Sequence, residues 1–122
     1  MAIIDTLKSS IKEEIEGAIS EFNLSRYKNA LILLSKALFS MSDYLIAVRN
    51  LKLPENHEER FRILERYMPK IYFILDKLFK KYTDTYLKPT DKESCTAMKN
   101  AIKKLAESEN FDKEIKEVAE KI

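Results

Sequence analysis

The side chain in this chain that is best suited to chemistry is His57, the only histidine among 122 residues. An imidazole titrates near neutral pH and can act as a general acid or a general base. Arg49 lies on the other side of the loop 51–56, so the two side chains can pair across it and form a polar pocket. The alternative is structural: His57 lies on the surface near a helix start, and Arg49 stabilises the last carbonyls of its own helix.

Three charged side chains, Lys36, Asp43 and Arg49, line one side of a predicted helix. With His57 folded back towards the end of that helix, they make a candidate ligand-binding set. A nucleotide phosphate would favour Lys36 and Arg49, because cations donate charge-assisted hydrogen bonds to phosphate oxygens. The alternative is that Lys36, Asp43 and Arg49 only form surface ion pairs, each worth under about 1 kcal/mol.

Residue counts exclude most catalytic and metal-binding patterns. The single glycine, Gly17, excludes a glycine-rich phosphate loop, and one histidine with one cysteine excludes the usual zinc spacings. The repeated Glu-x-x-His of a di-metal bundle and the strand-borne histidine of a serine triad are missing as well. We therefore expect no metal, no cofactor and no catalysis. Cys95 is expected to pack as a small hydrophobe.

Composition indicates one all-α domain spanning residues 1–122. The chain has one Gly and three Pro, whereas Lys, Glu, Leu, Ile and Ala are abundant. Its net charge is +2 with opposite signs interleaved, which gives no general argument for binding RNA. The acidic N-terminal region does not fit a signal peptide, and no stretch approaches the roughly 18 apolar residues of a membrane span. We expect a cytoplasmic protein without membrane contact, and the absence of Gln beside abundant Lys and Glu favours a thermophilic source.

The longest predicted helix covers residues 24–50 and has two apolar faces. Its broad face has apolar residues at helical spacing and would pack against the remaining helices. A narrower stripe on nearly the opposite side consists of Ile32, Phe39 and Ile46, spaced by seven. We expect this stripe to be covered either by a second subunit, as a homodimer interface, or by another helix.

The other helices follow from the same periodicity and from signals at their ends. A first helix over residues 4–22 contains Gly17, and a glycine there favours the close approach of another helix. Ser25 is predicted to cap the long helix at its N-terminus. Asn56 is predicted to cap the third helix, and Pro69 either kinks that helix or starts a fourth.

The C-terminal part is predicted to contain two helices. Thr90 with Glu93 fits a capping box, which predicts a helix starting near Asp91. The last apolar residues are out of phase with those before them, so we place a break at 108–110, followed by a short helix. The predicted fold is all-α: an up-and-down four-helix bundle with an additional short C-terminal helix.

Several segments resemble the HEPN superfamily of helical domains. A long apolar helix contributes segments 25–30, 35–39 and 43–45, and the loop after it ends in Pro-x-x-His at 54–57. A helix end bearing Tyr at 84–86 and an alanine-containing helix at 97–106 follow. The likeness extends over residues 5–120 and is particularly to small stand-alone archaeal members. It implies a bundle that is commonly dimeric, accompanies a minimal nucleotidyltransferase in a toxin–antitoxin-type pair, and binds nucleotides.

Some proteins of that superfamily are ribonucleases that use an Arg and a His a few residues apart. This chain departs from the pattern, because seven residues separate Arg49 from His57 and the positions where the Arg would have to lie hold Asn50, Leu51 and Lys52. A proline in the intervening loop also interrupts the helix that normally holds both. We therefore do not expect nuclease activity, and Arg49 and His57 are only weak catalytic candidates.

Three functions remain open. The first is a homodimeric, non-enzymatic protein that binds a nucleotide or accompanies a nucleotidyltransferase, joined through Ile32, Phe39 and Ile46. The second is a divergent ribonuclease that uses Arg49 and His57, which requires these two side chains to converge. The third is a general protein-interaction scaffold.

Overall fold

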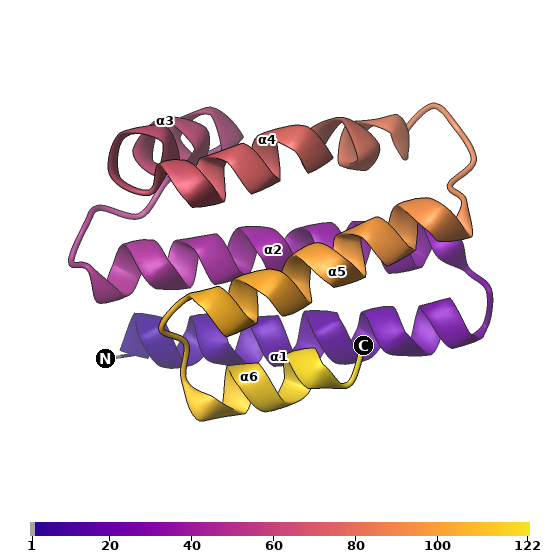
Figure 1. Ribbon diagram of the computed structural model, residues 1–122, viewed down its shortest axis with the longest axis horizontal. Helices are drawn as coiled ribbons and strands as arrows, with labels where there is room; N and C mark the ends of the chain where they lie inside the picture. Colours follow the sequence, from indigo (N-terminus) through magenta and orange to yellow (C-terminus); the bar gives the residue numbers. More distant parts are fainter. Residues whose placement is uncertain (1) are drawn as a thin grey trace.

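The computed structural model describes residues 2–122, which form helices and no strands. The six helices are α1 (Ala2–Asn23), α2 (Tyr27–Val48), α3 (His57–Tyr67), α4 (Pro69–Asp84), α5 (Lys92–Ser108) and α6 (Lys113–Glu120). Helices α1 and α2 lie side by side, α3 and α4 form a layer on α2, and α5 leads to α6, which lies against α1 (Figure 1). The predicted all-α bundle is confirmed.

Helices α1 and α2 form a hairpin and approach each other closely at Gly17. A Cβ atom placed on Gly17 would lie 3.2 Å from Leu33 Cδ1, which confirms the expected close approach of another helix. The turn between the helices differs from the prediction. Ser25 is not the cap of α2, because its backbone is left-handed, with φ 60°, and Arg26 takes the cap position. The left-handed residue ends α1 instead, and it lets the Arg26 amide donate to the Glu21 carbonyl at 2.9 Å.

Helix α2 is the central helix of the bundle. By length and composition it is apolar enough to cross a membrane, so the expectation that no stretch approaches this was wrong. In the folded chain, however, 67% of its most apolar window is buried, as in the core helix of a bundle. The helix ends at Val48 rather than at Asn50, because Asn50 adopts a left-handed φ of 58°.

The narrow apolar stripe of α2 is covered by the chain itself at two of its three positions. Phe39 is 8% exposed and Ile46 is fully buried, whereas Ile32 is partly exposed. The Phe39 ring packs against the rings of Phe79 and Tyr82 on α4, with centroids 6.2 and 5.3 Å apart. Another helix, rather than a second subunit, therefore covers Phe39. The predicted homodimer interface is wrong for Phe39 and Ile46, because both side chains are buried within the single chain.

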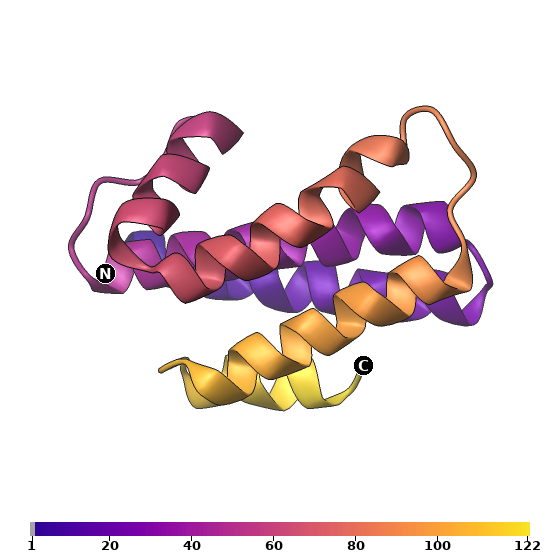
Figure 2. The same cartoon turned by 45° about the horizontal axis from the view of Figure 1, so that its top comes forward.

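Pro69 starts a new helix and does not kink a longer one. Asn56 caps α3 as predicted, since its Oδ1 accepts a hydrogen bond from the Glu59 amide at 2.9 Å. Helix α3 then ends at Tyr67, and Pro69 begins α4, where its missing N–H removes no helical hydrogen bond. Figure 2 shows that α3 and α4 meet at a marked angle. The first turn of α3 can therefore lie over α2.

The predicted break near residues 108–110 is confirmed, and α6 turns back against α1. Phe111, in the connection, stacks on the Tyr44 ring of α2 with centroids 5.5 Å apart. Asp112 caps α6 by accepting from the Glu114 amide, and its carboxylate also accepts from Lys8 Nζ of α1 at 3.2 Å. These contacts close the bundle at its C-terminal end.

Helix α5 is capped by Asp91, and the predicted capping box at Thr90 is not formed. Asp91 Oδ1 accepts from the Ser94 amide at 2.8 Å, which places the cap one residue later than predicted. Cys95 is fully buried on α5, as expected of a small hydrophobe, and its Sγ donates to the Tyr27 carbonyl at 3.3 Å. Burial raises the pKa of this thiol to about 11.

Candidate functional site

Three polar side chains meet where α3 lies over α2, and we call them the Asp43–Arg60–His57 cluster. Arg60 Nε donates to Asp43 Oδ1 at 2.8 Å, and Nη2 donates to Oδ2 at 3.0 Å. Arg60 Nη1 donates to His57 Nδ1 at 2.7 Å. The Arg60 and Asp43 side chains are only 12% and 16% exposed. The cluster thus brings together two of the four predicted ligand-binding residues, Asp43 and His57.

The local sequence explains why these three side chains meet. His57 is the first residue of α3 and Arg60 follows it by three, so both lie on one face of the helix. The Asn56 cap fixes where α3 starts and hence which face that is. Asp43 follows Phe39 by one turn on α2, so the carboxylate lies next to the ring that α3 and α4 cover.

Aromatic rings pack around the imidazole. The centroid of the His57 ring is 4.5 Å from that of Phe39, 5.3 Å from Phe79 and 5.9 Å from Tyr82. The Arg60 guanidinium carbon lies 5.2 Å from the Phe39 centroid, within the range of a cation–π contact. The cluster is therefore joined to the apolar contact between α2 and α4, and it does not stand in an open cleft.

The surroundings favour the neutral form of the His57 imidazole. Burial lowers the pKa of His57 and the positive charge of Arg60 lowers it further, while Asp43 acts in the opposite direction. A guanidinium N–H can only donate, so Nδ1 of the ring accepts and the ring proton lies on Nε2. The one nitrogen lone pair that could take a proton from a substrate is therefore occupied by Arg60.

Arg49 does not reach this cluster. Its Nη1 donates to the Tyr67 carbonyl at 3.5 Å, and its Nη2 lies 4.0 Å from Glu109 Oε1. Tyr67 is the last residue of α3 and His57 the first, so the two lie about 15 Å apart along the helix. The structure does not show the predicted pairing of Arg49 with His57. Arg49 instead contacts the C-terminal end of α3, where a cation is favoured.

Lys36 is exposed and its charge acts on α1. Burial raises the pKa of Glu14, and a hydrogen bond from Ser40 Oγ at 2.8 Å and the nearby charge of Lys36 both lower it. The Asp43 carboxylate is already bound to Arg60, and no ion pair between Lys36 and Asp43 forms within residues 2–122. The predicted set of Lys36, Asp43, Arg49 and His57 is thus divided among three places.

Arg60 is the residue of this site that sequence reasoning missed. Its signal was the spacing His57-x-x-Arg60, which puts two polar groups on one face at the start of a helix. A cation in the first turn of a helix is disfavoured by the helix dipole, and such a residue needs an acidic partner from elsewhere in the fold. Asp43 is that partner, but no pattern in the sequence identifies it.

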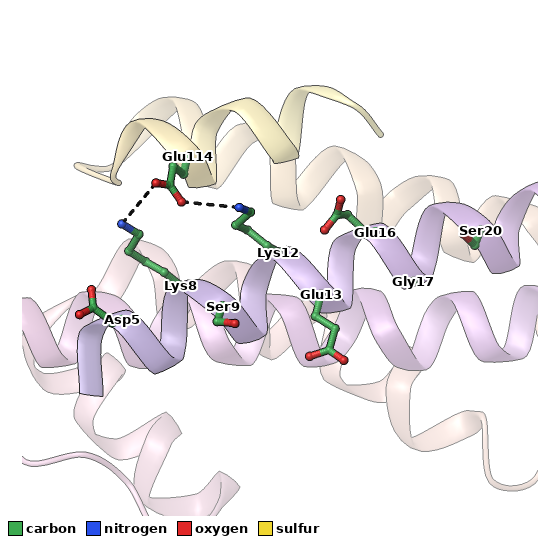
Figure 3. A pocket seen from close by; sticks show the side chains of 9 residues that line it. All are labelled: Asp5, Lys8, Ser9, Lys12, Glu13, Glu16, Gly17, Ser20 and Glu114. Carbon is green, nitrogen blue, oxygen red and sulfur yellow. Dashed lines mark ion pairs between the residues drawn. The ribbon is translucent and has the colours of Figure 1, made fainter. Parts of the chain in front are cut away.

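A hollow with a volume of about 800 Å³ runs along α1. Figure 3 shows Lys8 and Lys12 of α1 pointing towards Glu114 of α6, to which they lie at 4.0 and 3.6 Å. Four carboxylates line the hollow against these two lysines: Asp5, Glu13, Glu16 and Glu114. Since the cations are paired and acids outnumber them, the hollow is unsuited to an anionic ligand.

Metal-binding side chains do not gather in the described part of the chain. Among residues 2–122, no group of three or more His, Cys, Asp or Glu side chains is placed to hold a metal ion.

No protein-family model, curated protein or solved structure matches this chain.

Proposed function

We propose that this chain is a HEPN-like helical domain that acts by binding and has no catalysis of its own. Its binding partners are a nucleotide or a minimal nucleotidyltransferase, and it acts as a homodimer. The observation that supports the absence of catalysis is the state of His57, whose ring lone pair accepts a hydrogen bond from Arg60. A histidine bound in this way cannot take the proton of a ribose hydroxyl, as an RNA-cleaving base must.

The position of Arg49 supports the same conclusion. In the alternative, nucleolytic function, Arg49 and His57 would have to act on one phosphodiester. Arg49 contacts the carbonyl of Tyr67, at the other end of α3. Two side chains separated by the length of a helix of 11 residues do not converge on one phosphate within a single chain.

The contact with a second copy must use side chains other than Phe39 and Ile46, which are buried. Helix α4 has an exposed apolar ring, Phe73, which is 59% exposed. Tyr86 and Leu87, just after α4, are 68% and 88% exposed. Exposed apolar groups are favoured sites of protein contacts. We place Phe73 in the contact between subunits.

Incubation with single-stranded RNA tests the absence of catalysis. We expect the wild-type protein and a His57→Ala variant to give the same background cleavage, with folding of both checked by circular dichroism. Cleavage by the wild-type protein that is lost in His57→Ala would overturn the proposal.

Sedimentation tests the homodimer. We expect a dimer for the wild-type protein and a monomer for Phe73→Glu, with an unchanged helical circular dichroism spectrum, since the ring is exposed in the single chain. Leu24→Glu is the matched control, because Leu24 is 62% exposed in the turn between α1 and α2 and should leave the dimer intact. A wild-type protein that is monomeric, and that does not co-purify with a nucleotidyltransferase encoded beside it, would contradict the partner role.

A further inference from the structure

Helix α3 borders a second hollow, which we call the α3 basic pocket. It has a volume of about 350 Å³, and it is lined by six residues from α3 and from the start of the loop before it: Leu51, Lys52, Arg62, Ile63, Arg66 and Tyr67. The three charged residues of this lining are all cations. A hollow of this size is at the lower end of the range for small-ligand sites.

The charge of this pocket distinguishes it from three other charged hollows on the described part of the chain. The α1 hollow has more carboxylates than lysines. The hollow between α5 and α6 balances two lysines with two glutamates: Lys103, Lys116, Glu107 and Glu120. The hollow at the loop between α4 and α5 balances two lysines with two aspartates: Lys81, Lys88, Asp84 and Asp91. The α3 basic pocket has three positive charges and no acidic residue in its lining, so it favours an anion.

Within residues 2–122, these cations are not held by strong partners. No carboxylate in residues 2–122 lies within ion-pair distance of Lys52 or Arg66. Arg62 pairs with Glu58 at 2.7 Å, but both side chains are 74% exposed. Exposed pairs of this kind are weak and exchange readily with other anions. All three cations can therefore turn to a bound phosphate.

The pocket also offers a ring and an apolar wall. Tyr67 is 47% exposed, and the Arg66 guanidinium carbon lies 5.2 Å from the centroid of its ring. Leu51 and Ile63 are partly buried against the core and supply apolar surface beside the cations. An exposed ring next to cations is the combination by which proteins bind the base and the phosphate of a nucleotide.

We propose that the α3 basic pocket binds a nucleotide, with its phosphate at Lys52 and Arg66 and its base on Tyr67. The nucleotide is either free or one unit of a single-stranded RNA, since both present the same chemistry. This inference rests on the nucleotide-binding part of the proposed function. It moves the binding site from the predicted set around Asp43 and His57 to the opposite half of α3.

Titration of the isotope-labelled full chain, followed by backbone chemical shifts, tests the proposal. The probes are a nucleoside monophosphate, a short single-stranded oligoribonucleotide and inorganic phosphate. We expect the nucleotide probes to shift the resonances of Lys52, Arg66 and Tyr67. Tighter binding of the oligonucleotide, with the same shifts, identifies single-stranded RNA as the source of the nucleotide, and equal binding identifies the free nucleotide. Inorganic phosphate should bind more weakly, because it lacks a base.

Variants separate the two contacts. Arg66→Gln should weaken nucleotide binding about three- to tenfold, as expected for loss of one charged hydrogen bond at an exposed site. Tyr67→Leu should weaken binding of the nucleotide but not of phosphate. Lys28→Gln is the matched control, because it removes one exposed positive charge at the far end of α2 and should change nothing.

Each contrary result has its own meaning. Shifts around Asp43 and His57, with binding unchanged in Arg66→Gln, would overturn this site and leave the proposed function standing. Phosphate binding as tight as nucleotide binding would overturn the assignment of a nucleotide. The absence of shifts with every probe would overturn both this site and the nucleotide-binding part of the proposed function, while sedimentation still decides on the homodimer.

Discussion

Arg60 of α3 binds Asp43 of α2 through two hydrogen bonds, of 2.8 and 3.0 Å, and both side chains are largely buried. Paired hydrogen bonds between a guanidinium and a carboxylate restrict distance and orientation together. The contact therefore fixes where the first turn of α3 lies on α2. It also fixes His57, since the same guanidinium donates to the imidazole.

Loss of this contact should destabilise the fold. Arg60→Met keeps most of the side-chain stem but leaves the largely buried Asp43 carboxylate without its partner. We expect the free energy of unfolding to fall by about 2–3 kcal/mol, somewhat less than for a fully buried pair. Urea denaturation measures this change. Arg62→Met is the control, because the exposed pair of Arg62 with Glu58 should contribute under about 0.5 kcal/mol. Equal losses in the two variants would contradict the role of Arg60.

Stability should fall as pH drops below the ordinary pKa of His57, 6.5. The folded state lowers the pKa of this imidazole, mainly through burial, so between the two pKa values the unfolded chain binds more protons. The contribution of His57 is complete above pH 6.5 and is lost as pH falls through the lowered pKa. Denaturation at several pH values measures the slope.

The pH effect has a matched control in His57→Gln, whose amide oxygen can still accept from Arg60. This variant should lose the slope just below pH 6.5. Glu14 acts in the opposite direction, because burial raises the pKa of its carboxyl and the folded state then binds the extra proton. The difference between wild-type protein and variant removes this contribution. A slope that persists in His57→Gln would contradict the assignment.

Phe39 should behave as a core residue and not as an interface residue. Phe39→Ala leaves a cavity among the Phe79, Tyr82 and His57 rings and should cost about 3 kcal/mol, at the low end for a buried aromatic. Thermal or urea unfolding measures the loss. Phe73→Ala should change the stability of the monomer by less than about 0.5 kcal/mol, since that ring is 59% exposed. A Phe39→Ala variant with wild-type stability would show that α4 does not cover this ring.

Gly17→Ala should stabilise the fold slightly. Alanine gains about 1 kcal/mol of helix propensity over glycine. The added Cβ would lie 3.2 Å from Leu33 Cδ1, the end of a flexible and only partly buried side chain that can move by a few tenths of an ångström. We expect a net gain of about 0.5 kcal/mol by thermal unfolding. Gly17→Val adds bulk that Leu33 cannot accommodate and should destabilise. A loss in Gly17→Ala would mean that Leu33 is held rigidly.

Hydrophobic periodicity was sufficient to predict the helices and the break near residue 108. The helix ends were harder, because they depend on the conformation of single residues. Ser25 and Asn50 both adopt left-handed backbone angles, which end α1 and α2. The sequence does not distinguish a serine that ends one helix in this way from a serine that caps the next helix. Thr90 and Asp91 can both cap α5, and the stronger capping residue takes the position.

Three members of the candidate ligand-binding set were predicted to share one helix, and the fold divided them because they have partners on α1 and α3. Lys36 acts on Glu14 of α1, Asp43 binds Arg60 of α3, and Arg49 contacts the end of α3. Spacing along α2 shows which side chains share a face, but it does not show what covers that face. The direction of α3 depends on the loop 51–56 before it and on the break after Tyr67, where Pro69 starts α4.

The single thiol of the chain lies buried between α2 and α5. Cys95 is fully buried, donates to the Tyr27 carbonyl, and has a pKa of about 11, so it is neither exposed nor ionised near neutral pH. A thiol-reactive dye can therefore label this cysteine only when the two helices separate. The labelling rate of Cys95 therefore measures how often the bundle opens between α2 and α5, without any substitution in the chain.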